Sequence, residues 1–197
     1  MLRIFCLVLV LSFSKSSFSS DEDLVVEVRA TFYKSPRTNK YKYIKGSGFY
    51  VRRNLILTAY HVIEKRVKSD PITVIGSDFN EVEVELVYAN KFEDVALLRI
   101  VGHGRNVVNF CEKINYGDDA YLITRVDGEV VKKSGRINHI QERFLISTIK
   151  TRPGYSGSPV FIKRGFSICI GGMHRLSGSR HAPSWRLKRA IKKYLNR

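Results

Sequence analysis

Residues 153–159 read PGYSGSP, and this loop decides the expected fold when it is set beside two other stretches. Residues 58–61 read TAYH and end an apolar run, while residues 94–98 read DVALL, an acid that opens another apolar run. Each stretch alone is common in proteins of many kinds. Together, in this order, they supply a histidine, an aspartate and a serine, the three side chains that nucleophilic acyl transfer needs.

Acyl transfer explains why these residue types matter as a set. A serine hydroxyl is a poor nucleophile and needs an adjacent base. An imidazole base in turn needs a carboxylate that fixes its tautomer and stabilises its charged form. The glycines of residues 153–159 allow a sharp turn that exposes backbone N–H groups to a developing oxyanion. The sequence therefore favours a nucleophilic hydrolytic site.

The rest of the chain has the pattern of short strands. Residues 24–33 and 82–88 alternate apolar and polar side chains, and residues 95–101 are almost wholly apolar, which predicts a buried strand. Residues 102–106 read GHGRN and form a soft boundary. Further short strands are expected at 120–126, 129–132, 143–149, 160–163 and 166–171. These patterns predict an all-β barrel or sandwich in two similar halves.

The three stretches resemble the T-A-x-H, D-x-A-L-L and G-x-S-G-x-P signatures of the chymotrypsin-like serine peptidases. The resemblance covers roughly residues 24–180. It implies two six-stranded antiparallel β-barrels with the active site in the cleft between them. It also implies that His61 is the general base, that Asp94 orients it, and that Ser156 attacks the scissile carbonyl of a protein or peptide substrate. The N–H groups of Gly154 and Ser156 would form the oxyanion hole, with no cofactor.

One position departs from the digestive members of that family. Their nucleophile follows an Asp that pairs with a newly freed N-terminus, whereas this chain has Tyr155, so we expect no such activation. The loop is more similar to those of bacterial glutamyl endopeptidases and RNA-virus peptidases. In those enzymes a Thr five residues before the nucleophile and a His in a Gly-x-His motif bind the substrate side chain. Thr151 and His174 match that pattern, which implies cleavage after Glu, with Gln second. Lys150 replaces the Asp that selects basic residues, and His174 could instead be an ordinary loop histidine.

The N-terminus has the pattern of a signal peptide. Arg3 precedes the apolar stretch 4–13, which is too short to span a bilayer, and small residues follow before Asp21. We predict a signal peptide at residues 1–20 and a secreted or periplasmic protein, with a short membrane anchor as the alternative. No later stretch is apolar for long enough to span a membrane.

The remaining cysteines leave two possibilities open. Cys6 lies inside the predicted signal, so Cys111 and Cys169 either form one disulfide or are two buried thiols. No C-x-x-C pair is present, which argues against a structural zinc site, and we expect no bound metal.

The C-terminal segment differs from the rest of the chain. Ser184 is a candidate cap for a helix from Trp185 to about Leu195 with one apolar face and a basic remainder. The predicted domains are a signal peptide at 1–20, an N-terminal barrel at 21–105, a C-terminal barrel at 106–180 and a basic amphipathic helix at 181–197.

The net charge of +16 bears on partners and not on fold. No zinc-ligand spacing, aromatic RNA-binding motif or continuous basic arm accompanies it, so we expect no specific nucleic-acid binding. A contact with a polyanion through the basic surface is possible. Two alternatives to an endopeptidase stay open: a catalytically silent peptidase-like protein that binds an acidic partner, and an esterase that uses the same three residues.

Overall fold

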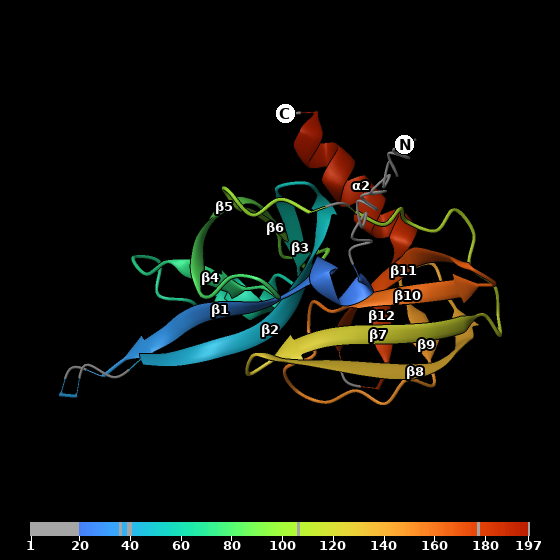
Figure 1. The fold of residues 1–197 in the computed structure, drawn as a ribbon, viewed down its shortest axis with the longest axis horizontal. Helices are drawn as coiled ribbons and strands as arrows, with labels where there is room; N and C mark the ends of the chain where they lie inside the picture. The colour runs from blue at the N-terminus through green and yellow to red at the C-terminus, as the bar shows by residue number, and fades with distance from the viewer. Residues whose placement is uncertain (1–19, 36, 39–40, 106, 177, 197) are drawn as a thin grey trace, which may run out of the picture.

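Two closed β-barrels lie side by side, and a C-terminal helix packs across them (Figure 1). The computed structural model describes residues 20–35, 37–38, 41–105, 107–176 and 178–196. The predicted signal peptide lies outside the described residues except for its last residue, Ser20. The expected all-β fold of two six-stranded antiparallel barrels is confirmed.

The N-terminal barrel closes in the order β1-β2-β3-β6-β5-β4. A short 3-10 helix at Asp21–Leu24 precedes it, and α1 (His61–Glu64) follows β3. Its strands are β1 (Val25–Lys34), β2 (Tyr41–Arg52), β3 (Leu55–Thr58), β4 (Ile72–Ile75), β5 (Val82–Asn90) and β6 (Val95–Arg99). The first four residues of β6 are fully buried, as their continuous apolar character predicts.

The C-terminal barrel closes in the order β10-β11-β12-β9-β8-β7. Its strands are β7 (Asp119–Val126), β8 (Glu129–Ile140), β9 (Leu145–Ser147), β10 (Pro159–Arg164), β11 (Ser167–Leu176) and β12 (Arg180–Pro183). The strand β12 extends into the segment 181–197, so the helix occupies only the later part of that predicted domain.

Polar contacts between buried groups hold the two barrels in one arrangement. The hydroxyls of Ser47 on β2 and Thr124 on β7 lie 2.8 Å apart, and both side chains are buried. Arg125 on β7 donates from Nε to the carbonyl of Val25 at 3.1 Å. The buried carboxylate of Glu27 accepts from the N–H of Gly128 at 2.8 Å. Because buried polar groups are costly when unpaired, these bonds favour a single docking of the barrels.

The helix α2 (Ser184–Leu195) begins one residue earlier than expected. Ser184 is not its N-cap, because the N-cap position is Pro183 and the Ser184 hydroxyl donates to the carbonyl of Cys111 at 3.1 Å. Leu187, Ala190 and Ile191 are buried at helical spacing, so the apolar face packs on the barrels.

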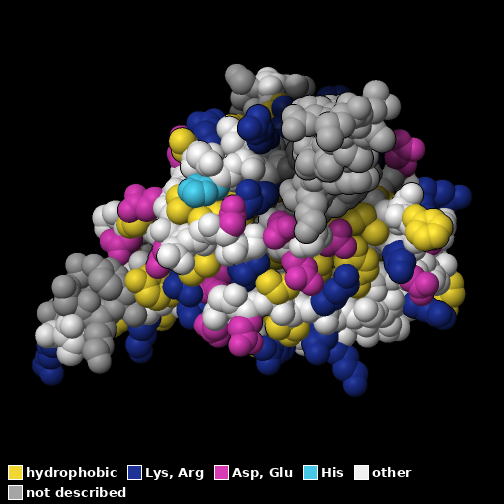
Figure 2. Space-filling view, in the orientation of Figure 1, with side chains coloured by type: hydrophobic (Ala, Val, Ile, Leu, Met, Phe, Trp, Pro, Cys, Tyr) yellow, Lys and Arg dark blue, Asp and Glu magenta, His cyan; other side chains and the backbone are white. Residues whose placement is uncertain are grey.

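The charged side chains are mixed over the surface. Figure 2 shows Lys and Arg side chains spread among Asp and Glu over the visible face.

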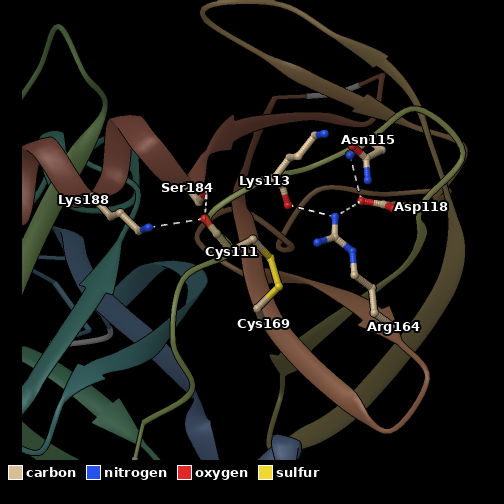
Figure 3. The surroundings of a disulfide bond; sticks show 8 residues. All are labelled: Cys111, Lys113, Asn115, Asp118, Arg164, Cys169, Ser184 and Lys188. Atoms are coloured by element: carbon tan, nitrogen blue, oxygen red, sulfur yellow. Dashed lines mark hydrogen bonds and ion pairs between the residues drawn. A yellow bond between two sulfur atoms is a disulfide. The ribbon is translucent and has the colours of Figure 1, made fainter.

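Cys111 and Cys169 form a disulfide, which settles the question that the sequence left open (Figure 3). The bond joins the connection between the barrels to β11. Next to it, the N–H of Cys111 donates to the carbonyl of Ile170 at 2.9 Å. The carbonyl of Cys111 accepts from Ser184 and, at 3.3 Å, from the ammonium of Lys188 (Figure 3). The disulfide ties β11 to this short segment, and the two hydrogen bonds to the Cys111 carbonyl tie α2 to it.

The described part of the chain contains no helix that is long and apolar enough to cross a membrane.

Candidate active site

The structure brings His61, Asp94 and Ser156 together from both barrels. His61 is the first residue of α1, directly after β3 and its short connection, and Asp94 ends the turn between β5 and β6. Ser156 lies in the loop before β10 of the other barrel. His61 Nε2 is 2.7 Å from Ser156 Oγ, and His61 Nδ1 is 3.0 Å from Asp94 Oδ2.

These contacts assign the protons on the imidazole. The carboxylate of Asp94 can only accept, so His61 Nδ1 carries the hydrogen. His61 Nε2 then has a free lone pair facing the hydroxyl of Ser156, which can donate to it. The backbone N–H of His61 also donates to Asp94 Oδ1, at 2.9 Å. The arrangement is what a base needs to take a proton from the serine.

Asp94 is buried, has an unusual backbone conformation and is kept ionised by its neighbours. It is 7% exposed and has a φ of 50°, in the left-handed region, where few residues other than glycine are found. Burial raises the pKa of its carboxyl, but hydrogen bonds and charge from His61, and a hydrogen bond from Arg175, outweigh it and hold the pKa below its usual value. Asp94 is therefore ionised at neutral pH.

The loop around Ser156 is anchored by backbone bonds. The carbonyl of Ser156 accepts from the N–H of Ser47 at 2.7 Å, and the N–H of Gly157 donates to the carbonyl of His174 at 2.9 Å. Gly157 has a φ of 86°, and a Cβ there would lie 1.9 Å from the carbonyl oxygen of Ser47. The loop therefore requires glycine at this position.

The first expected oxyanion donor, Gly154, lies in a hydrogen-bonded turn, in which the N–H of Tyr155 donates to the carbonyl of Arg152 at 3.2 Å. Gly154 has a φ of 93°, which side chains disfavour, and its neighbour Tyr155 is buried with Arg152 over its ring. Among the described residues, neither the N–H of Gly154 nor that of Ser156 donates to a protein acceptor. Two such N–H groups are available to an oxyanion on a bound substrate.

The three residues predicted to line the substrate pocket differ in how far they are buried. Lys150 is exposed and Thr151 is half-buried. His174 lies on β11 and is 2% exposed, so it is not an ordinary loop histidine. Its Nδ1 is 3.3 Å from Nδ1 of His181, whose Nε2 is 2.8 Å from the hydroxyl of Ser147. Within the described residues, His174 makes no hydrogen bond with Thr151.

Both buried histidines are neutral near pH 7. Burial, assisted by the charge of His61 and partly opposed by the carbonyl of Arg180, lowers the pKa of His174 to about 4. Burial and then the charge of His174 lower the pKa of His181 to about 3. A neutral imidazole can still donate one hydrogen bond to a polar ligand group.

Within the part of the chain that the structure describes, no three His, Cys, Asp or Glu residues are grouped to hold a metal ion.

Sequence reasoning missed Arg175 and His181. The Nε of Arg175 donates to Asp94 Oδ2 at 3.0 Å, so this arginine is part of the site. The only sequence signal for Arg175 is its place directly after the Gly172-Met173-His174 motif. His181 pairs with His174 across the β11–β12 hairpin, a register that the sequence alone does not give.

Two six-stranded barrels with a serine, a histidine and an aspartate joined at their junction define the two-barrel class of serine peptidases. Residues 46–170 match the model of the trypsin-like peptidase domain, and the chain belongs to that family. The predicted identity of a chymotrypsin-like serine peptidase is confirmed, while the similarity to glutamyl endopeptidases stays a prediction.

Relatives and solved structures agree with this family. A probable periplasmic serine endoprotease, DegP-like, from Pseudomonas putida (strain GB-1) is 30% identical over 151 residues, which are 70% of this chain and 31% of the relative. One from Ectopseudomonas mendocina (strain ymp) is 30% identical over 137 residues, 64% of this chain and 28% of the relative. The chain thus spans about a third of the length of these relatives.

Two crystal structures share the fold at low identity. A protease from M. tuberculosis in its active form has a TM-score of 0.71 and 18% identity, over 88% of this chain and 81% of that one. A serine endoprotease from Yersinia pestis has a TM-score of 0.72 and 20% identity, over 89% of this chain and 64% of that one.

Proposed function

We propose that this protein is an exported serine endopeptidase that hydrolyses peptide bonds with His61, Asp94 and Ser156 as its catalytic triad. The observation that carries the proposal is the chain of contacts from Ser156 Oγ to His61 Nε2 and from His61 Nδ1 to Asp94. Each residue comes from a different connection of the fold, and such a meeting of three reactive groups has no evident structural purpose.

The reaction follows from these contacts. His61 Nε2 takes the proton of Ser156 while Oγ forms a bond to the scissile carbonyl carbon. The N–H groups of Gly154 and Ser156 stabilise the resulting oxyanion. His61 then gives its proton to the leaving amine as the C–N bond breaks, which leaves an acyl-enzyme. A water, activated by His61, hydrolyses the ester and restores Ser156. Asp94 stabilises the imidazolium in both steps.

The substrate preference proposed is Glu before the scissile bond, with Gln second. His174 supports it, because a buried imidazole on β11 offers a hydrogen-bond donor next to the Ser156 loop. His181 and Ser147 fix the ring of His174 from behind. Lys150 and Arg152 are exposed on the segment before the nucleophile, where they add positive potential. A site built to pair a polar side chain rejects apolar ones strongly.

Export is proposed from three supporting observations. The N-terminal sequence has the charge and apolar length of a signal peptide. The Cys111–Cys169 disulfide is typical of an oxidising compartment. The relatives are described as probable periplasmic proteases. Together they favour the periplasm or the extracellular space.

A polyanion contact through α2 is also proposed. Its exposed cations are Lys188, Arg189, Lys192 and Lys193. Arg186 is excluded from this surface, because its Nε donates to Glu93 at 2.8 Å and its side chain is largely buried. The remaining four charges lie within six residues of one helix and can face an anionic surface together.

Labelling with a fluorophosphonate probe tests the catalytic proposal. The wild-type protein should be labelled and should cleave a Glu-containing peptide. Ser156→Ala should lose both, with a fall in turnover on the order of a million-fold. Ser167→Ala is the matched control, since Ser167 is exposed at the start of β11. An unlabelled wild-type protein would instead support a silent binding protein. Labelling with turnover of esters but not of peptides would support an esterase.

A further inference from the structure

Arg175 places a permanent positive charge against the back of the site. Its side chain is 12% exposed and that of Asp94 is 11% exposed. Arg175 Nε and His61 Nδ1 each lie 3.0 Å from the same oxygen, Asp94 Oδ2. The two nitrogens are therefore no more than about 6 Å apart. One carboxylate oxygen thus links the candidate base to a guanidinium.

The pair is unlike the surface ion pairs of this protein. Arg136 Nε and Asp119 Oδ1 lie 3.1 Å apart, but both side chains are about 70% exposed, at 72% and 68%. Exposed pairs of that kind contribute little, whereas a buried pair costs desolvation and needs good geometry. A guanidinium keeps its charge and its planar fork at all relevant pH values. Arg175 is therefore suited to act on Asp94 at any pH at which the enzyme works.

The other charged groups near the imidazole do not substitute for Arg175. His174, the other titratable group that β11 brings close, is neutral near pH 7 because of its burial. Glu64 of α1 pairs with Lys91 at 2.7 Å. Among the residues that the structure describes, the Asp94 carboxylate has two partners, His61 and Arg175.

We propose that Arg175 is a positioning residue of the catalytic site, which holds the Asp94 carboxylate toward His61 and, by its charge, opposes protonation of the imidazole at mildly acidic pH. This inference rests on the proposed triad. The mechanism is electrostatic and geometric. The guanidinium shares the negative charge of Asp94, so a proton on His61 gains less from that carboxylate. The Nε–H bond also removes one rotational freedom from the carboxylate.

The pH dependence of kcat/KM for a short neutral peptide tests the charge. Arg175→Gln keeps a donor but removes the charge, and the acid limb of its profile should move up by about one pH unit. That size follows from Coulomb's law for a unit charge at about 6 Å with an effective dielectric between about 20 and 80. Arg175→Lys restores the charge and should return the limb to within about 0.3 unit of wild type.

The kinetic constants test the geometry. Lysine lacks the Nε–H group that Arg175 donates to Asp94, so Arg175→Lys should lower kcat about tenfold while KM changes less than about twofold. Arg136→Gln, which breaks a similar but exposed pair, is the matched control and should change neither the profile nor kcat. Circular dichroism and thermal unfolding check that each variant is folded.

The outcomes separate the two proposals. A wild-type protein that fluorophosphonate does not label would overturn the triad itself. If the wild type is labelled and active but Arg175→Gln keeps the acid limb in place, the charge effect of Arg175 is refuted. If Arg175→Gln does not fold, Arg175→Lys decides: wild-type kcat in that variant refutes the positioning role, and a tenfold loss with an unmoved acid limb supports it.

Discussion

Acidification should destabilise the folded protein below about pH 6.5, because two buried histidines resist protonation in the folded state. The pKa of His174 is lowered to about 4 and that of His181 to about 3, from a usual value of 6.5. In the unfolded chain both rings take up protons as the pH falls through 6.5, while in the folded chain they stay neutral. The unfolded state therefore binds more protons, and folding stability falls with pH.

The size of the effect follows from these pKa values. Between pH 7.5 and pH 5.0, each histidine should lower the free energy of unfolding by about 2 kcal/mol, and the pair by about 4 kcal/mol. The loss continues until the pH passes below the pKa values of the folded state. A change of about 4 kcal/mol is a large part of the stability of a typical domain. Ending the range at pH 5.0 leaves most carboxylates ionised in both states.

Guanidinium unfolding of the Ser156→Ala protein at both pH values measures this loss without self-cleavage. His181→Gln in that background should lose only about 2 kcal/mol over the same range, whatever its stability at pH 7.5. His139→Gln is the control, because His139 is exposed on β8, and it should lose as much as the parent. Equal pH dependence in the His181→Gln and parent proteins would refute the role of the buried pair.

Three further outcomes are expected. His174→Ala should lower kcat/KM for a Glu peptide at least about a hundredfold, as read from a peptide-library profile; a wild-type profile dominated by basic or large apolar residues would reject the pocket. Binding to a soluble polyanion should weaken steeply as salt is added while cleavage of a neutral peptide hardly changes, and equal sensitivity would remove the α2 contact. Cys111→Ala with Cys169→Ala should lower the free energy of unfolding by about 2–4 kcal/mol in denaturant titrations, since the disulfide closes a long loop; unchanged stability would contradict this.

The fold could be predicted from sequence because its strands carry local signals. Continuous apolar residues predicted β6 correctly. The turn-rich stretch 102–106 stays a predicted boundary between the barrels. The number of strands and their closure came from the family resemblance and not from periodicity. The helix start was misplaced by one residue, because a serine at a helix start predicts a side-chain cap. Here tertiary packing directs the hydroxyl of Ser184 to Cys111 instead.

The disulfide shows where sequence reasoning ends. Two cysteines in an exported chain fit a bond or two thiols equally well, and only their spatial separation decides. Cys111 and Cys169 are 58 residues apart, with Cα atoms 5.0 Å apart. That proximity depends on how the connection between the barrels returns along β11, where Phe110 forms a bridge with Ile170. No local pattern encodes this return.

The difference between local sequence patterns and contacts made only by the fold also explains which site residues could be predicted. His61, Asp94 and Ser156 lie in short motifs of neighbouring residues, so a sequence pattern can point to each of them. Arg175 contacts Asp94, which is 81 residues away and lies in the other barrel. His181 contacts His174, which is 7 residues away across a hairpin. Neither residue belongs to a recognised motif, and an arginine or a histidine in a strand is ordinarily solvated. Their importance arises only when the fold buries them against Asp94 and His174, so the chemistry of this site depends on contacts that the motifs do not contain.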